Sequence, residues 1–320
     1  MSDIPLFNKQ AFPWVNSDSY FDDSVLYPKL SIVVPSYNQA DYLEETLLSI
    51  IHQNYPCLEL IVIDGGSTDH SVEIIKKYEQ YISYWVSEKD GGQSHAINKG
   101  FEKATGKWLA WMNSDDCYLE GALHTIFTKL PHIDSDFIFG YCSVGETFAD
   151  SIPQIHTSGV RKNLEDILLF FYNVRYIIPS QSVFVRKSLV DKVGLLDESL
   201  HYCMDLDWYA RLYSAKPRLF EYPFSLSFFR INSTTKTGSQ QIKMQNEAIE
   251  LALKYSVGLD SSKIARIKSL VSYHSRFILS NLYTENTSVF NSIKVFANTP
   301  REAFVDTRFW GNLKKVLVSW

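Results

Sequence analysis

The amino-acid sequence predicts an α/β fold with a mainly parallel central sheet flanked by helices, on the basis of two observations. Short runs rich in β-branched and aromatic residues alternate with segments whose apolar residues recur at helical spacing, as strands joined by helical crossovers do. The first four of these runs each lead into a group of small or acidic residues. In parallel sheets, ligands bind at this edge, where the carboxyl ends of the strands meet.

The first strand is expected over residues 29–38, where "KLSIVVPSYN" ends in a proline and small polar residues. The next helix is expected to begin at Asp41, because Glu44 lies three residues on and apolar residues then recur at helical spacing. The same alternation predicts strands over 58–64, 82–86, 107–112 and 136–141, with helices over 68–78, 94–104 and 119–130 between them.

After residue 142 the alternation is less regular. The pattern there predicts helices over 163–172 and 205–214, strands over 180–187 and 223–230, and mainly helix from residue 240 onward. A polar segment at 235–240 is the clearest break in the chain. We therefore expect an N-terminal extension (1–28), an α/β domain (29–235) and a helical C-terminal extension (236–320).

Composition and charge narrow the classes of protein. The 320 residues, of which 45% are hydrophobic, are enough for one large domain with an appendage. A formal net charge of −5 gives no overall attraction to nucleic acid, so we expect no nucleic-acid partner. The four cysteines form no C-x-x-C pair and the first ten residues lack the pattern of a secretion signal, which predicts a reduced, cytoplasmic protein.

The polar groups at the strand ends predict a site for a metal ion and a diphosphate. They are Pro35-Ser36-Tyr37-Asn38, Asp64 to Asp69, Lys89 to Gly92 and Asn113-Ser114-Asp115-Asp116. Neither G-x-G-x-x-G nor G-x-x-x-x-G-K-[ST] is present, so phosphate groups need another counter-charge. Adjacent aspartates are hard ligands suited to Mg²⁺ or Mn²⁺, which would bridge them to a diphosphate. Each group taken alone is also typical of a turn or a helix cap.

Four longer blocks of sequence strengthen this prediction. They read "SIVVPSYNQADYLEETLLSI", "LIVIDGGSTDHS", "EKDGGQSHAINKGFEKATGKWLAWMNSDD" and "IPSQSVFVRKSLVDKVGLLDESLHYCMDLDWYARL". In this order, within residues 29–232, they resemble the successive motifs of family 2 glycosyltransferases, the inverting enzymes of the GT-A fold. The resemblance implies a metal-dependent hexosyltransferase that uses Mn²⁺ or Mg²⁺. Its expected donor is a nucleotide-diphosphate sugar, a UDP-sugar in the first instance, and its acceptor a glycan or lipid-linked sugar in polysaccharide or glycoconjugate biosynthesis.

The resemblance also assigns nucleotide-binding roles to strand-end residues. These are Pro35, Ser36 and Tyr37 along the nucleoside, Asp64 at the nucleobase, Asp90 lining the nucleotide pocket, and Asp115. In the family's DxD-type block, one carboxylate contacts the metal and a neighbour can hold the ribose. Because Asn113 stands in place of the first aspartate, the metal contact is assigned to Asp115 and Asp116 without deciding between them.

Asp205, in "CMDLDWYARL", matches the acidic residue at the start of a helix that acts as the family's catalytic base. Inverting transfer is a single displacement, in which a carboxylate takes the proton of the attacking hydroxyl while the diphosphate leaves from the opposite face. Asp207 is the competing candidate. Its position four residues before Arg211 on the expected helix favours a structural ion pair instead. The alternative role of Asp205 is a plain helix cap.

Two further positions are less clearly assigned. Arg230-Ile231-Asn232 stands where the family often has Arg-x-His, and an amide is a poorer metal ligand than imidazole, so Asn232 is left out of the metal site. Gln181 fits the family's polar residue near the acceptor, with a hydrogen-bonded buried amide as the alternative.

Other functions stay open on the sequence alone. The alternatives are a non-catalytic nucleotide-sugar-binding protein with the same fold and a metal-dependent phosphohydrolase. Asp205 separates them, because a binding protein needs no base and a hydrolase needs no acceptor.

The final segment, 308–320, places aromatic and aliphatic residues on one helical stripe flanked by lysine and arginine. Such a helix either docks on protein or lies in a membrane interface, where it would hold a cytoplasmic enzyme at the inner face of the membrane.

Overall fold

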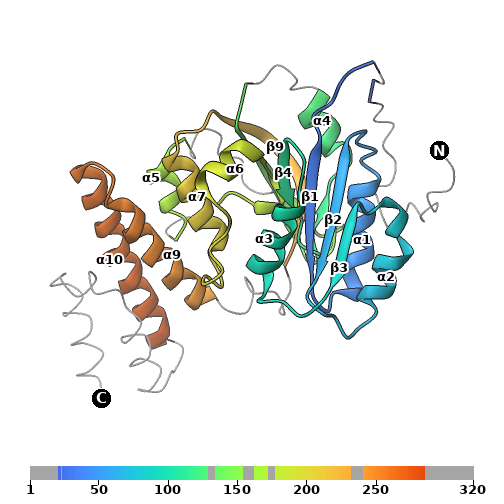
Figure 1. Ribbon diagram of the computed structural model, residues 1–320. Coiled ribbons are helices and arrows are strands. Elements are labelled where there is room, and N and C mark those ends of the chain that lie inside the picture. The colour runs from blue at the N-terminus through green and yellow to red at the C-terminus, as the bar shows by residue number, and fades with distance from the viewer. Residues whose placement is uncertain are drawn as a thin grey trace. The chain divides into compact units, whose positions relative to one another are not determined.

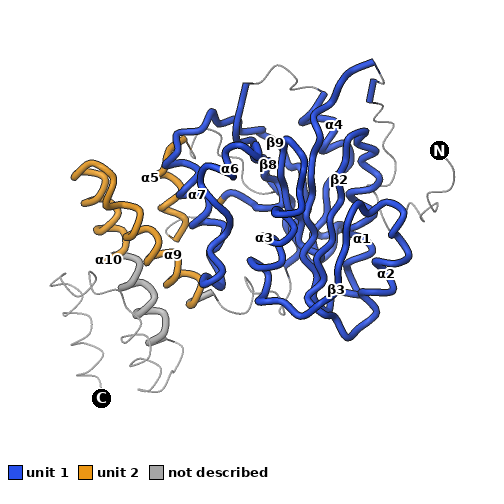
Figure 2. Tube along the Cα trace, viewed as in Figure 1, with its two compact units in different colours: residues 1–159, 178–235 blue, residues 160–177, 236–320 orange. Residues whose placement is uncertain are grey.

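The computed structural model describes residues 21–22, 24–128, 134–153, 162–171, 177–231 and 241–284, except the side chains of 152–153, 241–242 and 273–284. The chain divides into two compact units, which Figure 2 colours blue and orange. Unit 1 comprises residues 1–159 and 178–235, and unit 2 comprises residues 160–177 and 236–320. The expected break after residue 235 is also a division between the units. Residues 160–177, however, group with the C-terminal helices and not with the α/β domain in which we expected them.

Unit 1 is built around one sheet. Its strands are β1 (Leu30–Ser36), β2 (Leu58–Asp64), β3 (Tyr84–Ser87), β4 (Trp108–Trp111), β5 (Cys117–Tyr118), β6 (Phe137–Gly145), β7 (Ile152–Pro153), β8 (Val183–Arg186) and β9 (Leu219–Arg230). Within the described residues they form a nine-stranded sheet in the order β3-β2-β1-β4-β8-β6-β9-β5, with β7 paired to β6. Strands β1, β2, β3, β4, β6 and β9 run in one direction, and β5, β7 and β8 run in the other. The predicted α/β class is confirmed.

Helices cover both faces of this sheet (Figure 1). They are α1 (Ala40–Ile51), α2 (Ser71–Lys77), α3 (Gln93–Lys103), α4 (Ala122–Thr128), α6 (Lys187–Val193) and α7 (Met204–Ser214), with the 3-10 helices η1 (Glu79–Tyr81) and η3 (Ser180–Ser182). Ile32 and Val34 of β1 share a buried core with Leu47 of α1, because alternate residues of a strand face the same side. Val33 faces α3. A Cβ added at Gly100 would lie 2.3 Å from Val33 Cγ1, so α3 can approach β1 this closely only with glycine there.

The observed elements differ from the expected ones mainly at their ends. The helix expected over 119–130 is α4, and the strand β5 before it was not predicted, because two residues are too few to show a period. The strand expected over 180–187 divides into η3, β8 and the first residue of α6. Helix α6 is an addition to the predicted elements.

Unit 2 is helical in its described residues, with α5 (Leu164–Leu168), α9 (Gln241–Ser256) and α10 (Ser261–Thr284). Helix α5 begins with a capping box, in which the amides of Asp166 and Asn163 donate to each other's side chains at 3.2 Å. It contacts α9, which contacts α10, and Arg266 of α10 donates to Glu165 Oε1 at 2.6 Å. The predicted C-terminal helices are confirmed up to residue 284. The segment 308–320 lies outside the described residues. None of the described helices has the length and apolar character that crossing a bilayer requires.

Candidate active site

The carboxyl ends of β1 and β2 lie side by side, because their register pairs Ser36 with Asp64. The Asp64 carboxylate is fully buried and organises the loop after β2. Its Oδ2 accepts hydrogen bonds from the amides of Gly66 (3.1 Å) and Ser67 (2.9 Å) and from Ser87 Oγ (2.6 Å). Its Oδ1 accepts one from Ser67 Oγ at 2.5 Å. Contact between Asp64 and a nucleobase stays a prediction.

The loop after β1 is tied to the loop after β2. Asn38 adopts a left-handed φ of 51°, its amide donates to Ser67 Oγ at 2.8 Å, and its Oδ1 accepts from the amide of Thr68 at 2.8 Å. Tyr37 is 60% exposed, so its ring is open to a ligand at this edge. Ser36 is buried, and its Oγ has no hydrogen-bond partner among the described residues. The predicted loop therefore exposes the ring of Tyr37, whereas Ser36 and the residue before it, at position 35, are buried in β1.

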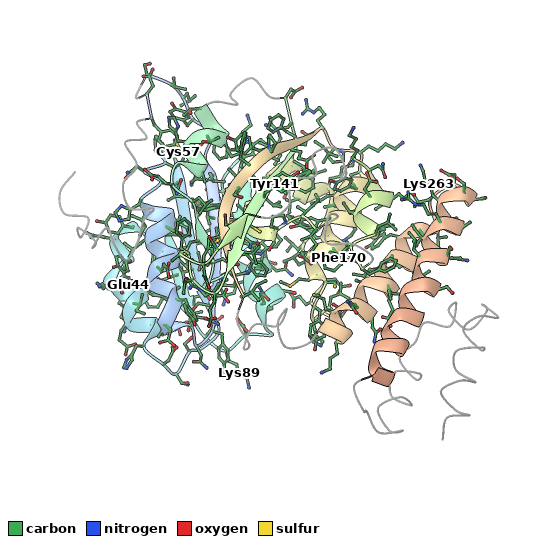
Figure 3. All side chains as sticks on the ribbon, turned by 180° about the vertical axis from the view of Figure 1, so that it is seen from behind. Glu44, Cys57, Lys89, Tyr141, Phe170 and Lys263 are labelled. Carbon is green, nitrogen blue, oxygen red and sulfur yellow. The ribbon has the colours of Figure 1, made fainter. Side chains whose placement is uncertain are left out.

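Asp90 lies against the loop after β2. A Cβ added at Gly65 would come within 3.0 Å of Asp90 Oδ2, so the glycine leaves room for this carboxylate. Asp90 Oδ1 accepts from the amide of Gly92 at 2.8 Å, and Gly92 precedes α3 with a φ of 108° that favours glycine. Lys89, labelled in Figure 3, is an exposed cation in the same loop. The carboxylate predicted to line the nucleotide pocket is thus held beside the end of β2.

The first turn of α3 joins the ends of two other elements. Gln93 Nε2 donates to Asn113 Oδ1 at 2.8 Å, which connects α3 to the end of β4. Ser94 Oγ donates to Met204 Sδ at 2.7 Å, which connects α3 to the first residue of α7. Asp205 follows Met204. The first turn of α3 therefore contacts both the turn that contains Asp115 and the residue that precedes Asp205.

The two adjacent aspartates lie in different environments. Asp116 is fully buried; its Oδ1 accepts from the amide of Arg230 at 2.9 Å and its Oδ2 from Asn113 Nδ2 at 3.0 Å. Asp115 is half-buried, and no other described residue donates a hydrogen bond to its carboxylate. Burial raises the pKa of Asp115, and burial together with the charge of Asp115 raises the pKa of Asp116 well above its usual range. Of the predicted pair, only Asp115 has a carboxylate that accepts no hydrogen bond from another described residue, and we call this carboxylate open in that sense.

Arg230 belongs to this turn, although the sequence pattern does not reveal it. Its side chain is buried: Nε donates to the carbonyl of Asp115 (3.0 Å), Nη1 to the carbonyl of Glu146 (2.9 Å) and Nη2 to Glu45 Oε2 (2.7 Å). Its guanidinium also lies over the ring of Tyr42, 4.6 Å from the ring centroid. These partners are distant in the sequence. The sequence feature that could have pointed to Arg230 is its place in Arg230-Ile231-Asn232, which stands where the family often has Arg-x-His. Asn232 itself lies outside the described residues.

Helix α7 carries the predicted base and its competitor. Asp207 is buried and its Oδ2 accepts from Arg211 Nε at 2.9 Å, so the predicted ion pair is confirmed. Asp205 is half-buried in the first turn, and its Oδ1 accepts from the amide of Leu206 at 2.8 Å. Burial and then the charge of Asp205 raise the pKa of Tyr209, one turn along the helix. Asp207 is committed to its ion pair, whereas the role of Asp205 as base stays a prediction.

Gln181 lies in η3 and is 3% exposed. Its Oε1 accepts a long hydrogen bond from Ser180 Oγ at 3.4 Å, and its Nε2 has no partner among the described residues. Within the part of the chain that the structure describes, the Gln181 amide is therefore not fully hydrogen-bonded. A buried donor without a partner is unfavourable, which makes Gln181 a candidate for contact with a ligand.

The turn that contains Asp115 fits a divalent ion only with the help of a bound ligand. Among the described residues, no group of three His, Cys, Asp or Glu side chains could hold a metal ion by itself. Mg²⁺, however, is usually held by one or two carboxylates together with substrate phosphates. The open carboxylate of Asp115 fits this arrangement. Asp116 does not, because it is fully buried and both of its oxygens are hydrogen-bonded.

Two solved structures share the fold of this chain. S. aureus TarS in complex with UDP-GlcNAc matches with a TM-score of 0.64 at 18% identity, covering 86% of this chain and 82% of that chain. The mannosyltransferase PcManGT from Pyrobaculum calidifontis, in complex with GDP-Man and Mn²⁺, matches with a TM-score of 0.59 at 16% identity, covering 97% and 92%. At these identities the likeness shows the fold alone, which is the GT-A fold of glycosyltransferases.

The chain belongs to glycosyl transferase family 2, whose sequence model matches residues 31–191, half of the chain. An uncharacterized glycosyltransferase of Rickettsia prowazekii is 28% identical over 225 residues, which is 69% of this chain and 70% of that protein. A second one, of Rickettsia typhi, is 30% identical over 187 residues, 57% of this chain and 58% of that protein. Bacillus subtilis TuaG, named for teichuronic acid biosynthesis, is 38% identical over 92 residues, 28% of this chain and 36% of its own length. The sequence-based assignment to this family is confirmed.

Proposed function

We propose that the protein is an inverting hexosyltransferase that moves a sugar from a nucleotide-diphosphate sugar to a glycan or lipid-linked acceptor in polysaccharide or glycoconjugate biosynthesis. Family membership supports glycosyl transfer. The structures of TarS with UDP-GlcNAc and PcManGT with GDP-Man support a nucleotide-sugar donor, with a UDP-sugar as our first choice. The name of TuaG supports the polysaccharide context.

One observation carries the proposal: the first turn of α3 bonds both to the end of β4 and to the start of α7. A donor whose nucleotide lies along the loops of Tyr37 and Asp90 would have its diphosphate near Asp115 and its sugar toward α7. The exposed ring of Tyr37 offers a surface on which a base can stack. Asp64 shapes this pocket through the loop that it holds.

Asp115 would hold a divalent ion, Mn²⁺ or Mg²⁺, together with the donor diphosphate. Such an ion supplies charge neutralisation of the leaving diphosphate. We therefore narrow the metal role from the predicted pair to Asp115 alone. Asp116 instead fixes the turn, because it holds the amide of Arg230 and the side chain of Asn113.

Asp205 is the proposed base. Its carboxylate would take the proton of the acceptor hydroxyl as that oxygen bonds to the anomeric carbon and the nucleotide diphosphate leaves from the opposite face. Gln181 is the proposed polar contact of the acceptor, because its buried Nε2 has no partner among the described residues. We keep a cytoplasmic location and a membrane contact through residues 308–320 as further proposals.

A panel of UDP, GDP, CDP and their sugars with Mn²⁺, scored by the melting temperature of the protein, tests the donor class. A ligand at 100 times its Kd stabilises the folded state by about 2.7 kcal/mol. The stabilising nucleotide sugar is then incubated with the protein with and without candidate acceptors. Transfer of the sugar with inverted anomeric configuration supports the proposal, and release of nucleotide that no acceptor accelerates would indicate a hydrolase. Binding without either reaction would support the alternative of a non-catalytic nucleotide-sugar-binding protein.

A further inference from the structure

The Asp115 turn is held from two sides by groups that lie far away in the sequence. From β9, Arg230 donates two hydrogen bonds to the turn: its backbone amide donates to Asp116 Oδ1 and its Nε donates to the carbonyl of Asp115. Its Nη1 also donates to the nearby carbonyl of Glu146. From α1, Thr46 Oγ1 donates to the Asp116 carbonyl at 2.8 Å. The turn therefore cannot shift without breaking contacts to both elements.

Glu45 occupies the remaining side of the Arg230 guanidinium. It accepts from Nη2 at 2.7 Å, and its side chain is 18% exposed against 8% for Arg230. Tyr42, one turn before Glu45 on the same face of α1, lies under the guanidinium, and Phe228 has its ring centroid 5.1 Å away. Helix α1 thus positions the Arg230 guanidinium with the ring of Tyr42 and neutralises its charge with the Glu45 carboxylate.

This arrangement explains how Asp115 keeps an open carboxylate beside a buried arginine. A guanidinium favours paired hydrogen bonds to a carboxylate, and the nearest backbone oxygen to Arg230 Nε belongs to Asp115 itself. Because Glu45 takes the outer nitrogen, the guanidinium bonds the carbonyl of Asp115 and leaves its side chain unbonded. Without that counter-charge, Arg230 would compete with a cation for Asp115.

We propose that Arg230 and Glu45 act as a positioning pair, in which Arg230 sets the Asp115 turn and Glu45 keeps the guanidinium away from the Asp115 carboxylate. In this proposal neither residue needs to contact the donor. This inference rests on the proposed role of Asp115 in binding a metal ion with the donor diphosphate. It adds that the affinity of the site for that ion is set from α1, by a residue of the first sequence block to which the sequence analysis assigns no role.

The test measures Mn²⁺ bound to the full chain with UDP, and separately with GDP, by electron paramagnetic resonance of the free ion, together with kcat and the KM for Mn²⁺. Glu45→Gln retains the size of the side chain and one acceptor, so the fold should persist. We expect it to weaken Mn²⁺ binding about 10-fold, and Arg230→Lys to weaken it about 10- to 100-fold, as loss of a residue that orients a metal ligand does. In the Arg230→Gln background, Glu45→Gln should have no further effect.

Two matched controls separate positioning from general loss of charge. Glu44→Gln changes the neighbouring carboxylate of α1, labelled in Figure 3, which pairs with Lys77. Arg218→Lys changes an arginine just before β9, which pairs with Asp136. Both should bind Mn²⁺ as the parent protein does. If the parent binds Mn²⁺ and Glu45→Gln binds it equally well, the inference is overturned and the proposed function stands. If the parent binds no Mn²⁺ with either nucleotide, the metal role of Asp115 falls and the inference with it.

Discussion

Asn98 of α3 and Leu196 form a reciprocal pair, in which Asn98 Nδ2 donates to the Leu196 carbonyl at 3.0 Å and the Leu196 amide donates to Asn98 Oδ1 at 2.9 Å. Asn98 Nδ2 also donates to Glu198 Oε1 at 2.9 Å. The pair fastens the connection between α6 and α7 to α3, one turn beyond Ser94. Because α7 begins at the end of this connection, Asn98 helps to set where Asp205 lies.

Asn98→Ala should lower the free energy of unfolding by about 1 to 3 kcal/mol, because it leaves the buried amide and carbonyl of Leu196 unpaired. It should also lower kcat more than it raises the KM for the donor, since the loop that it releases leads to Asp205. Urea unfolding and steady-state kinetics measure the two effects. Asn98→Asp keeps the acceptor for the Leu196 amide but places a buried carboxylate against Glu198 Oε1 and the Leu196 carbonyl, so it should be no more stable than Asn98→Ala. Unchanged stability in Asn98→Ala would contradict the role of the pair.

Asp205→Asn and Asp207→Asn should give different phenotypes. Asp205→Asn should bind the nucleotide sugar normally and lose about 10²- to 10⁴-fold in kcat, the usual contribution of a general base. Asp207→Asn removes the buried partner of Arg211 and should mainly lower stability. Isothermal titration with the donor, melting temperatures and transfer rates distinguish them. The reverse pattern would make Asp207 the base.

Asp115→Asn should abolish metal-dependent turnover while leaving the melting temperature nearly unchanged, because its carboxylate holds no other described residue. Asp116→Asn should instead lower the melting temperature, since Asp116 accepts from Arg230 and Asn113 in a fully buried position. Activity is measured with Mn²⁺ and with excess chelator. Full activity of the parent protein in chelator would exclude the metal role.

Asp64→Ala should weaken nucleotide binding by about 1 to 3 kcal/mol, because it leaves the donors of Gly66, Ser67 and Ser87 without their acceptor and loosens the pocket wall. Asp64→Asn retains part of that hydrogen bonding and serves as the milder variant. Titration of UDP into each protein gives the dissociation constants. An unchanged value for Asp64→Ala would mean that this loop does not contribute to the nucleotide pocket.

Glu59 should make folding stability depend on acid pH. Burial raises its pKa, but hydrogen bonds from Lys29, Ser31 and Thr105 outweigh burial and hold the pKa at about 2. Because this value is below the unfolded one, about 4.3, the contribution of Glu59 is fully present above that pH and is lost as pH falls toward 2. Urea midpoints should show Glu59→Gln less stable than the parent at pH 6 and nearly equal to it near pH 2. A constant difference across this range would contradict the prediction.

The sequence predicts contacts that are local or that follow from strand order. Asp207 and Arg211 are four residues apart in the sequence, so helical spacing alone predicts their ion pair. The meeting of Ser36 and Asp64 follows from two parallel strands. The sequence does not predict the choice between Asp115 and Asp116, because burial of Asp116 depends on Arg230, more than a hundred residues away. Nor does the sequence predict that the Asp64 carboxylate accepts hydrogen bonds from Ser67, because these bonds depend on the conformation of the loop after β2.

The composition of unit 2 from residues 160–177 and 236–320 has a consequence for biosynthesis. Helix α5 leaves the ribosome before β8, α6, α7 and β9, and its buried Ile167 and Leu168 have no α9 to pack on until those elements have been made. Chains fold from the N-terminus during synthesis. Until α9 has been made, α5 is therefore a short apolar segment that is exposed to chaperones and proteases. A nascent chain stalled after residue 235 would keep this segment uncovered, and truncation of the C-terminal helices should therefore reduce the yield of soluble protein.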